Sequence, residues 1–200
     1  VRDNKYLKDK FPNKDFSYHD HRDCDINNFL PAIEYATKRG YFVFRMGENL
    51  KIKNINIKNK KFINYSSLYR SEFLDVYLSK RCSFIISTGG GFDTLASVSF
   101  RKPILSVNAT SILNHILHEC DQMIYSFKHH YDNRKKKYLS IEEILDKNVG
   151  KSLRKELYIN QNISLIESNS REIKGMTEDF IDFIEQGQKE NYNSIIQKKI

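Results

Sequence analysis

The sequence is poor in cysteine and contains no long apolar run. Its three cysteines, Cys24, Cys82 and Cys120, form neither a CxxC pair nor the regular framework of a small secreted domain, so we expect no disulfide and a reducing compartment. No apolar stretch approaches the roughly 20 residues that cross a bilayer, and the start of the chain lacks a signal-peptide core. These absences predict a cytoplasmic protein without a membrane span.

Length and charge narrow the choice of partner. The 200 residues, 40% of them hydrophobic, suit one compact domain. The net charge of +8 is spread through Lys-, Asn- and Ile-rich sequence and does not gather on one helix face, which argues against a nucleic-acid partner. The tight basic run at residues 134–137 is predicted to be a surface loop. It is either simply solvated or a contact for an anionic acceptor or for lipid at the inner face of the cytoplasmic membrane.

Strand and helix patterns alternate along the chain. Asp25 can cap a helix that Gly40 ends, Ser71 can cap another, and residues 140–143 form a capping box. The order predicted is strands at 41–44 and 62–65, a helix at 72–80, a strand at 83–86, a helix at 92–100, a strand at 103–107, a helix from 140, a strand near 163–166 and a helix at 171–186. This order predicts an α/β fold with a parallel, Rossmann-like sheet flanked by helices and a helical C-terminal tail.

The most informative feature is the glycine turn, residues Gly89, Gly90 and Gly91, between an apolar strand and a helix. Such a turn leaves N–H groups at a helix N-terminus, where the helix dipole favours an anion. The turn lacks the Lys-Ser/Thr of a P-loop and the spacing of a dinucleotide fingerprint. A diphosphate is one occupant that fits. The alternative is that glycine serves only tight packing of helix on strand.

Other candidates lie at neighbouring strand ends. Arg45 and Gly47 follow the strand at 41–44, and Asn108 follows the strand at 103–107, so three loops are expected to converge on one crevice. An arginine there can bind phosphate, or it can form a surface ion pair. Asp93 can accept a hydrogen bond from a ribose or sugar hydroxyl; alternatively, the helix dipole alone favours an acid in the first turn of the helix. Residues 49–61 are expected to be a loop next to Gly47 that could serve as a lid.

The segment from Tyr18 to Asp25 concentrates two histidines, three aspartates and an arginine. Its spacing matches no standard zinc site, and Asp25 is explained as a helix cap. We interpret His21 or Asp23 as a catalytic base or a sugar ligand, with a hydrated capping loop as the alternative.

As a set, these motifs resemble a family of bacterial glycosyltransferases with two Rossmann domains (GT-B type). The similarity is carried by residues 1–8, Tyr18-His19, Arg22-Asp23, residues 40–47, 73–78 and 82–84, the glycine turn, Lys102-Pro103 and Asn108. It covers most of the first 110 residues. Where the family commonly has a Ser-Ser-Gly triplet, this chain has Thr88 before three glycines; related UDP-sugar 2-epimerases have a similar Gly-Gly turn.

The resemblance implies that the 200 residues are the nucleotide-sugar-binding domain of a longer enzyme, with its N-terminal domain missing. Residues 1–25 would border the interdomain cleft, 26–130 would form the sheet core, and 131–200 would be a mainly helical end. Arg45, Gly47 and the Thr88 to Gly91 turn would bind the donor, and Arg2, Asp3, Arg22 and Asp23 would face the cleft. No cofactor or metal is implied beyond the nucleotide-sugar donor.

The predicted function is therefore transfer of a sugar from a nucleotide donor to a cell-surface polysaccharide or lipopolysaccharide acceptor. Two alternatives stay open at the level of sequence. One is an epimerase-like enzyme that acts on the nucleotide sugar without an acceptor. The other is a non-catalytic module that binds a nucleotide sugar.

Overall fold

A three-stranded parallel sheet forms the centre of the structure. The computed structural model describes residues 1–48, 55–111, 122–151 and 154–186. In the sheet, β3 (Ile85–Ser87), β4 (Ile104–Ala109) and β5 (Met123–Phe127) lie in that order, with Ile85 opposite Ile104 and Ile104 opposite Met123. Every residue of β4 is buried, as expected for a strand covered on both faces. The predicted α/β fold with a parallel sheet is confirmed.

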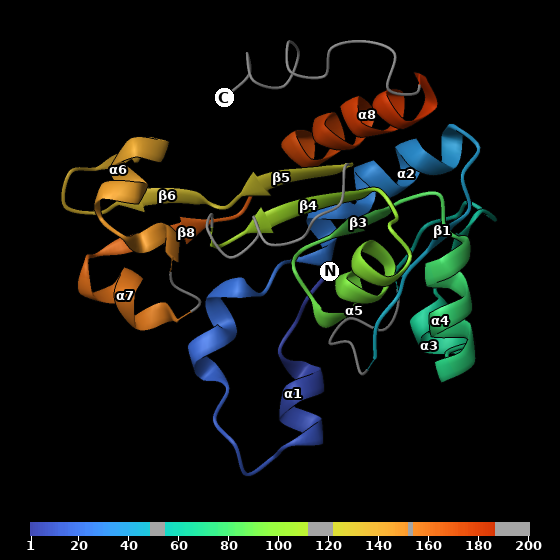
Figure 1. Ribbon diagram of the computed structural model, residues 1–200, viewed down its shortest axis with the longest axis horizontal. Helices are drawn as coiled ribbons and strands as arrows, with labels where there is room; N and C mark the ends of the chain where they lie inside the picture. The colour runs from blue at the N-terminus through green and yellow to red at the C-terminus, as the bar shows by residue number, and fades with distance from the viewer. Residues whose placement is uncertain (49–54, 112–121, 152–153, 187–200) are drawn as a thin grey trace.

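Helices cover both faces of this sheet. Figure 1 shows α2 (Leu30–Lys38) and α8 (Ser170–Gln186) side by side on one face, and α5 (Gly91–Thr94) on the other. The π-helical turn η3 (Leu95–Ser99) continues α5. Phe180 of α8 is fully buried in the main hydrophobic core and meets the ring of Phe84 edge-on, with centroids 5.5 Å apart. The core therefore lies between the sheet and the α2–α8 pair.

The strands predicted at 41–44 and 62–65 are shorter and more exposed than the sequence indicates. β1 (Val43–Phe44) and β2 (Phe62–Ile63) form a separate parallel pair. The prediction that 41–44 is covered on both faces is wrong, because Phe42 is 63% exposed. Tyr65 starts α3 (Tyr65–Leu68) instead of extending β2, and its hydroxyl is held by Asp75 of α4 (Glu72–Arg81). Ser71 caps α4 through the N–H of Leu74, as predicted.

A second, antiparallel sheet continues directly from β5. It consists of β6 (His129–Asp132), β7 (Lys137–Tyr138) and β8 (Ile163–Ile166), in the order β7-β6-β8. Between β7 and β8 lie α6 (Ile141–Asp146), the short η4 (Val149–Lys151) and α7 (Lys155–Asn160). The sequence predicts β8 and the capping box of α6, and both are present. It does not predict β6 and β7, which the exposed basic turn at 134–136 joins.

The first 25 residues, here called the cleft segment, are mostly irregular. They contain α1 (Lys5–Lys10) and the 3₁₀ helix η1 (Ser17–Arg22), and η2 (Ile26–Phe29) then leads into α2. Of the predicted lid, residues 49–54 lie outside the described residues, and 55–61 have no regular helix or strand. Among the described residues, no helix combines the length and the apolar character that a membrane span requires.

The position of Phe180 gives a test of the core. We expect Phe180→Ala to lower the free energy of unfolding by about 3–5 kcal/mol, because a cavity replaces the buried ring. Urea denaturation followed by circular dichroism measures the change. Phe73→Ala is the matched control: Phe73 is 74% exposed, so its loss should change stability by less than about 0.5 kcal/mol. Equal effects of the two substitutions would contradict this description of the core.

Candidate active site

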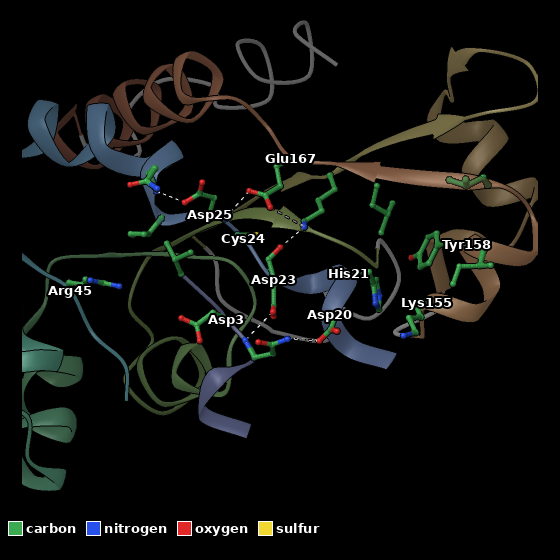
Figure 2. A pocket seen from close by; sticks show the side chains of 18 residues that line it. Asp3, Asp20, His21, Asp23, Cys24, Asp25, Arg45, Lys155, Tyr158 and Glu167 are labelled. Carbon is green, nitrogen blue, oxygen red and sulfur yellow. Dashed lines mark hydrogen bonds and ion pairs between the residues drawn. The ribbon is translucent and has the colours of Figure 1, made fainter. Parts of the chain in front are cut away.

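A cavity of about 820 Å³ lies where the cleft segment meets the two sheets. Figure 2 shows Arg45 at one end, Tyr158 and Lys155 at the other, and carboxylates between them. The lining comes from four parts of the chain: the cleft segment with the residues after it, the end of β1, the β5–β6 junction, and the α7–β8 region. Its charged members are Asp3, Asp20, Asp23, Asp25, Arg45, Lys128, Lys155 and Glu167.

Hydrogen bonds fix the start of the cleft segment against the glycine turn. The N–H of Arg2 donates to the Thr88 hydroxyl at 2.8 Å, and the Arg2 carbonyl accepts from the N–H of Cys24 at 3.1 Å. Asn4 donates its main-chain N–H to Asp23 at 3.0 Å and its side-chain amide to Asp20 at 2.7 Å. Residues distant in sequence therefore form one wall of the cavity.

Lys128 holds the cleft segment from the opposite side. Its side chain is only 4% exposed, and its ammonium donates to the Asp23 carbonyl at 2.6 Å and lies 3.7 Å from a carboxylate oxygen of Glu167. Glu167 also accepts from the N–H of Asp25 at 3.0 Å. A buried ammonium is stable only when such partners compensate for lost water.

Within the glycine turn, the chain supplies one anion of its own. The N–H of Gly90 donates to the Asp93 carboxylate at 3.0 Å, and the Ser87 hydroxyl donates to its other oxygen. Burial raises the pKa of Asp93, while the hydrogen bond from Ser87 opposes that shift. Asp93 thus fixes the shape of the turn from the inside. Gly89 has φ +79°, a backbone conformation that favours glycine.

Gly90 and Gly91 differ from Gly89 because neither packing nor conformation requires glycine there. Gly90 has φ −105°, which other residues adopt readily. Apart from the adjoining residues and the backbone of the same helix, a Cβ placed on Gly90 or on Gly91 would meet no atom of the described residues within 4 Å. The backbone at these two positions faces open space. Tight packing of the helix on the strand therefore does not explain why residues 90 and 91 are glycines.

Two arginines, Arg2 and Arg22, lie beside this turn, and a third, Arg45, lines the cavity at the end of β1. Arg22 donates to the Gly89 carbonyl at 3.0 Å, and Arg2 has its Nε 4.0 Å from the Asp23 carboxylate. Arg45 is buried at the end of β1, where burial lowers its pKa and the charge of Asp3 opposes the shift. Burial also lowers the pKa of Arg2 and Arg22, and repulsion between these two adds to the effect on Arg22. All three remain charged, because guanidinium groups do not deprotonate in proteins.

His21 lies in the acidic part of the cavity near Tyr158, with ring centroids 5.4 Å apart. Burial, followed by the charge of Arg22, lowers the pKa of His21 to about 4, so the imidazole is neutral at pH 7. Both ring nitrogens are buried and make no hydrogen bond of normal geometry with the described residues. Cys24 also lines the cavity, but burial raises the pKa of its thiol to about 11. The thiol is therefore protonated and a poor nucleophile.

The structure places four of the predicted site residues in the lining of the cavity, whereas the glycine turn is not part of that lining. Asp3, His21, Asp23 and Arg45 line the cavity. Thr88 and Gly89 are joined to its wall through Arg2 and Arg22, and Gly47, with φ +130°, follows Arg45 by two residues. Asn108 is buried at a bulge of β4, where its side chain accepts from the N–H of Ser168. In the described part of the chain, no group of three or more His, Cys, Asp or Glu could hold a metal ion.

Sequence reasoning missed the side of the cavity formed by Lys128, Lys155, Tyr158 and Glu167. Glu167 was accessible to prediction, because it directly follows the predicted strand at 163–166. Nothing in the sequence marks Tyr158, whose hydroxyl donates to the Thr110 carbonyl 48 residues away.

Comparisons with known proteins do not assign the chain to a family. No protein-family model matches the chain, and neither the curated proteins nor the solved structures gave a significant match. The resemblance to glycosyltransferases accordingly stays a prediction from the motifs.

The low pKa of His21 predicts acid sensitivity. An unfolded histidine takes up a proton near pH 6.5, whereas folded His21 does so only near pH 4. The stability that comes from keeping His21 neutral is thus present above pH 6.5 and is lost as the pH falls from 6.5 to 4. For this partly buried side chain we expect a loss of about 1–2 kcal/mol.

Urea unfolding at pH 7, 6, 5 and 4 measures this effect. Over this range, the free energy of unfolding of His21→Gln should fall less steeply with decreasing pH than that of the unsubstituted chain. His129→Gln, at a 43% exposed position paired with Glu172, is the control. Parallel curves for His21→Gln and the unsubstituted chain would contradict the assignment.

Proposed function

We propose that this chain binds a nucleotide-sugar donor and takes part in transfer of its sugar to a cell-surface glycan or glycolipid. The observation that carries the proposal is the open backbone at Gly90 and Gly91 next to two arginines of the cleft segment, Arg2 and Arg22. Bare backbone at a helix N-terminus and guanidinium forks are both suited to phosphate oxygens. A diphosphate is the ligand class that uses both features.

The carboxylates of the cavity are suited to binding the sugar that is attached to that diphosphate. Asp3, Asp20, Asp23, Asp25 and Glu167 share one lining with only three cationic side chains. A carboxylate accepts hydrogen bonds from hydroxyl groups and repels phosphate. The phosphates would therefore lie toward Arg45 and the glycine turn, and the sugar hydroxyls toward the acids.

The same arrangement favours bond cleavage. When the bond between the anomeric carbon and the phosphate oxygen breaks, negative charge grows on the departing nucleoside diphosphate. Positive charge fixed around the glycine turn then binds the transition state more tightly than the ground state. Asp93 would keep the turn in position from the inside while the ligand approaches the open side at Gly90 and Gly91.

The partners proposed are the nucleotide sugar, a glycan or glycolipid acceptor, and an N-terminal α/β domain that would complete the cleft. The exposed turn at residues 134–136 would allow peripheral contact with an anionic membrane surface. The epimerase-like alternative acts on the donor alone. Analysis of the products formed from donor without acceptor separates it from a transferase.

Arg45 gives the first test of donor binding. Titration calorimetry with UDP, GDP and CMP and their sugar conjugates should reveal one preferred nucleotide. We expect Arg45→Ala to weaken its binding by about 1.5–3 kcal/mol, the value of a hydrogen bond to a charged group. Arg45→Lys keeps the charge and should recover part of the loss. Arg81→Ala, at an exposed position on α4, should bind as the unsubstituted chain does.

Gly90→Ala separates a binding role of the turn from a packing role. The added methyl group meets open space, and the backbone φ suits alanine. We therefore expect the free energy of unfolding to stay the same or to rise by up to about 1 kcal/mol. Nucleotide affinity should nevertheless fall at least about tenfold, since the methyl group occupies the approach to the backbone.

Gly89→Ala is the contrasting variant and should lose stability, because φ +79° strains alanine. Undiminished nucleotide binding by a folded Gly90→Ala protein would count against the proposed phosphate site.

A further inference from the structure

The two candidate bases of the cleft segment, His21 and Asp23, have different surroundings. The Asp23 carboxylate accepts from the N–H of Asn4 at 3.0 Å and lies 4.0 Å from Nε of Arg2, and its carbonyl accepts from Lys128. These contacts hold the start of the cleft segment in place. A proton taken up by Asp23 would weaken the contacts that build the cavity wall.

Among the described residues, His21 makes no hydrogen bonds comparable to those that Asp23 makes. Its two ring nitrogens are buried and have no hydrogen-bond partner of normal geometry among the described residues, and only a weak interaction with the Tyr18 main chain favours the charged ring. A buried polar group without a partner destabilises a fold. Such groups are retained in native structures most readily where a ligand supplies the partner. The ring also lines the cavity, in contact with α7 through Tyr158.

The contact with Tyr158 shows which part of the cavity His21 borders. The Tyr158 ring packs near both His21 and the buried His130, with centroids 5.4 Å and 5.8 Å away, and its hydroxyl donates to the Thr110 carbonyl. Beyond it, the α7–β8 wall contributes Lys155, Ile159 and Leu165 to the same cavity. Arg45 lies at the opposite end (Figure 2). His21 therefore borders the half of the cavity that is remote from Arg45.

We propose that His21 is the base that accepts the proton of the acceptor hydroxyl, that Asp23 is a positioning residue, and that the α7–β8 wall next to His21 is the acceptor side of the cavity. This inference rests on the proposed function. The acceptor oxygen bonds to the anomeric carbon while its proton passes to a ring nitrogen of His21. The bond from the anomeric carbon to the phosphate oxygen breaks, and the nucleoside diphosphate leaves with the electron pair. His21 then releases the proton to solvent.

For this step, the imidazole must turn toward the cavity, because both of its nitrogens are buried in the structure. The turn breaks no hydrogen bond of normal geometry, so its cost is limited to the rearrangement of packing around the ring. The neutral form present at pH 7 is the form that can accept a proton.

The experiment compares His21→Gln, Asp23→Asn and, as matched control, His129→Gln at the exposed first residue of β6. Binding of UDP, GDP and CMP is measured by calorimetry. Release of nucleotide from UDP-glucose, GDP-mannose and CMP-N-acetylneuraminate, with water as the acceptor hydroxyl, measures the chemical step. We expect His21→Gln to keep nucleotide affinity within about twofold and to lose about 100-fold in release rate. The control should match the unsubstituted chain in both.

Asp23→Asn should show the signature of a positioning residue: a lower melting temperature and weaker nucleotide binding, with a release rate that recovers at saturating donor. The rate of the unsubstituted chain should rise with pH up to the pKa of His21 and be flat above it, and His21→Gln should lack that rise. A folded His21→Gln protein with an unchanged release rate would overturn the inference and leave the proposed function standing. Absence of nucleotide binding by the folded unsubstituted chain would instead overturn the proposed function.

A spectroscopic readout covers the case in which release is too slow to measure. The ring signals of His21, assigned by their absence in His21→Gln, should shift when the nucleotide sugar that binds is added, while those of His129 stay in place. Unmoved His21 signals at saturating nucleotide sugar would count against the inference.

Discussion

The ammonium group of Lys128 connects the three parts of the chain that form the cavity. Lys128 lies between β5 and β6, at the junction of the parallel and antiparallel sheets. It donates to the carbonyl of Asp23 in the cleft segment and pairs with Glu167, which directly follows β8. Because the side chain is almost fully buried, its charge can be accommodated only while both partners are in place. The cleft segment and the two sheets therefore constrain one another at this point.

The geometry around the glycine turn depends on the position of the cleft segment. With Asp23 and Asp25 held by Lys128 and Glu167, Arg2 reaches Thr88 and Arg22 reaches Gly89. Two positive charges are thereby placed beside a turn whose own carboxylate, Asp93, is turned inward. A ligand approaching Gly90 and Gly91 would meet arginines supplied by a segment nearly 70 residues earlier in the sequence.

Local signals in the sequence predicted much of the fold. Ser71 and Ser140 cap their helices through hydrogen bonds to residues three positions on, an arrangement that depends on neighbours alone. By contrast, β6 contains His129, His130 and Asp132, which give no apolar pattern. It is a strand because it pairs with β8, and His130 is buried there with Nδ1 hydrogen-bonded to the Lys128 carbonyl. Such long-range pairing leaves no local signal.

The residues of the candidate site also divide into those that the sequence indicates and those that only the folded chain brings together. Arg45 was marked by its place at a strand end, since strand ends converge in parallel α/β folds, and Asp3 and Asp23 were assigned to the cleft by the family resemblance. All three line the cavity. The contribution of α7 could not be predicted, since Tyr158 reaches the site only through folding of the antiparallel sheet around it. The inward use of Asp93 was likewise hidden, because an acid in the first turn of a helix is compatible with either role.

The cavity combines two electrostatic environments that would conflict if they were mixed. Acids in the middle of the lining would repel a phosphate, and arginines next to His21 would lower its basicity further, as Arg22 already does. In the proposed reaction, Arg45 at one end of the cavity would stabilise negative charge, while His21, toward the other end, would accept a proton. In a sugar transfer both changes accompany a single substitution at the anomeric carbon, so charge leaves toward one end of the cavity and a proton leaves toward the other. A protein frame lowers the barrier for such a step only if it holds the reacting groups in place, and in this chain the Lys128 contacts hold the cleft segment, which carries His21, against the end of β8.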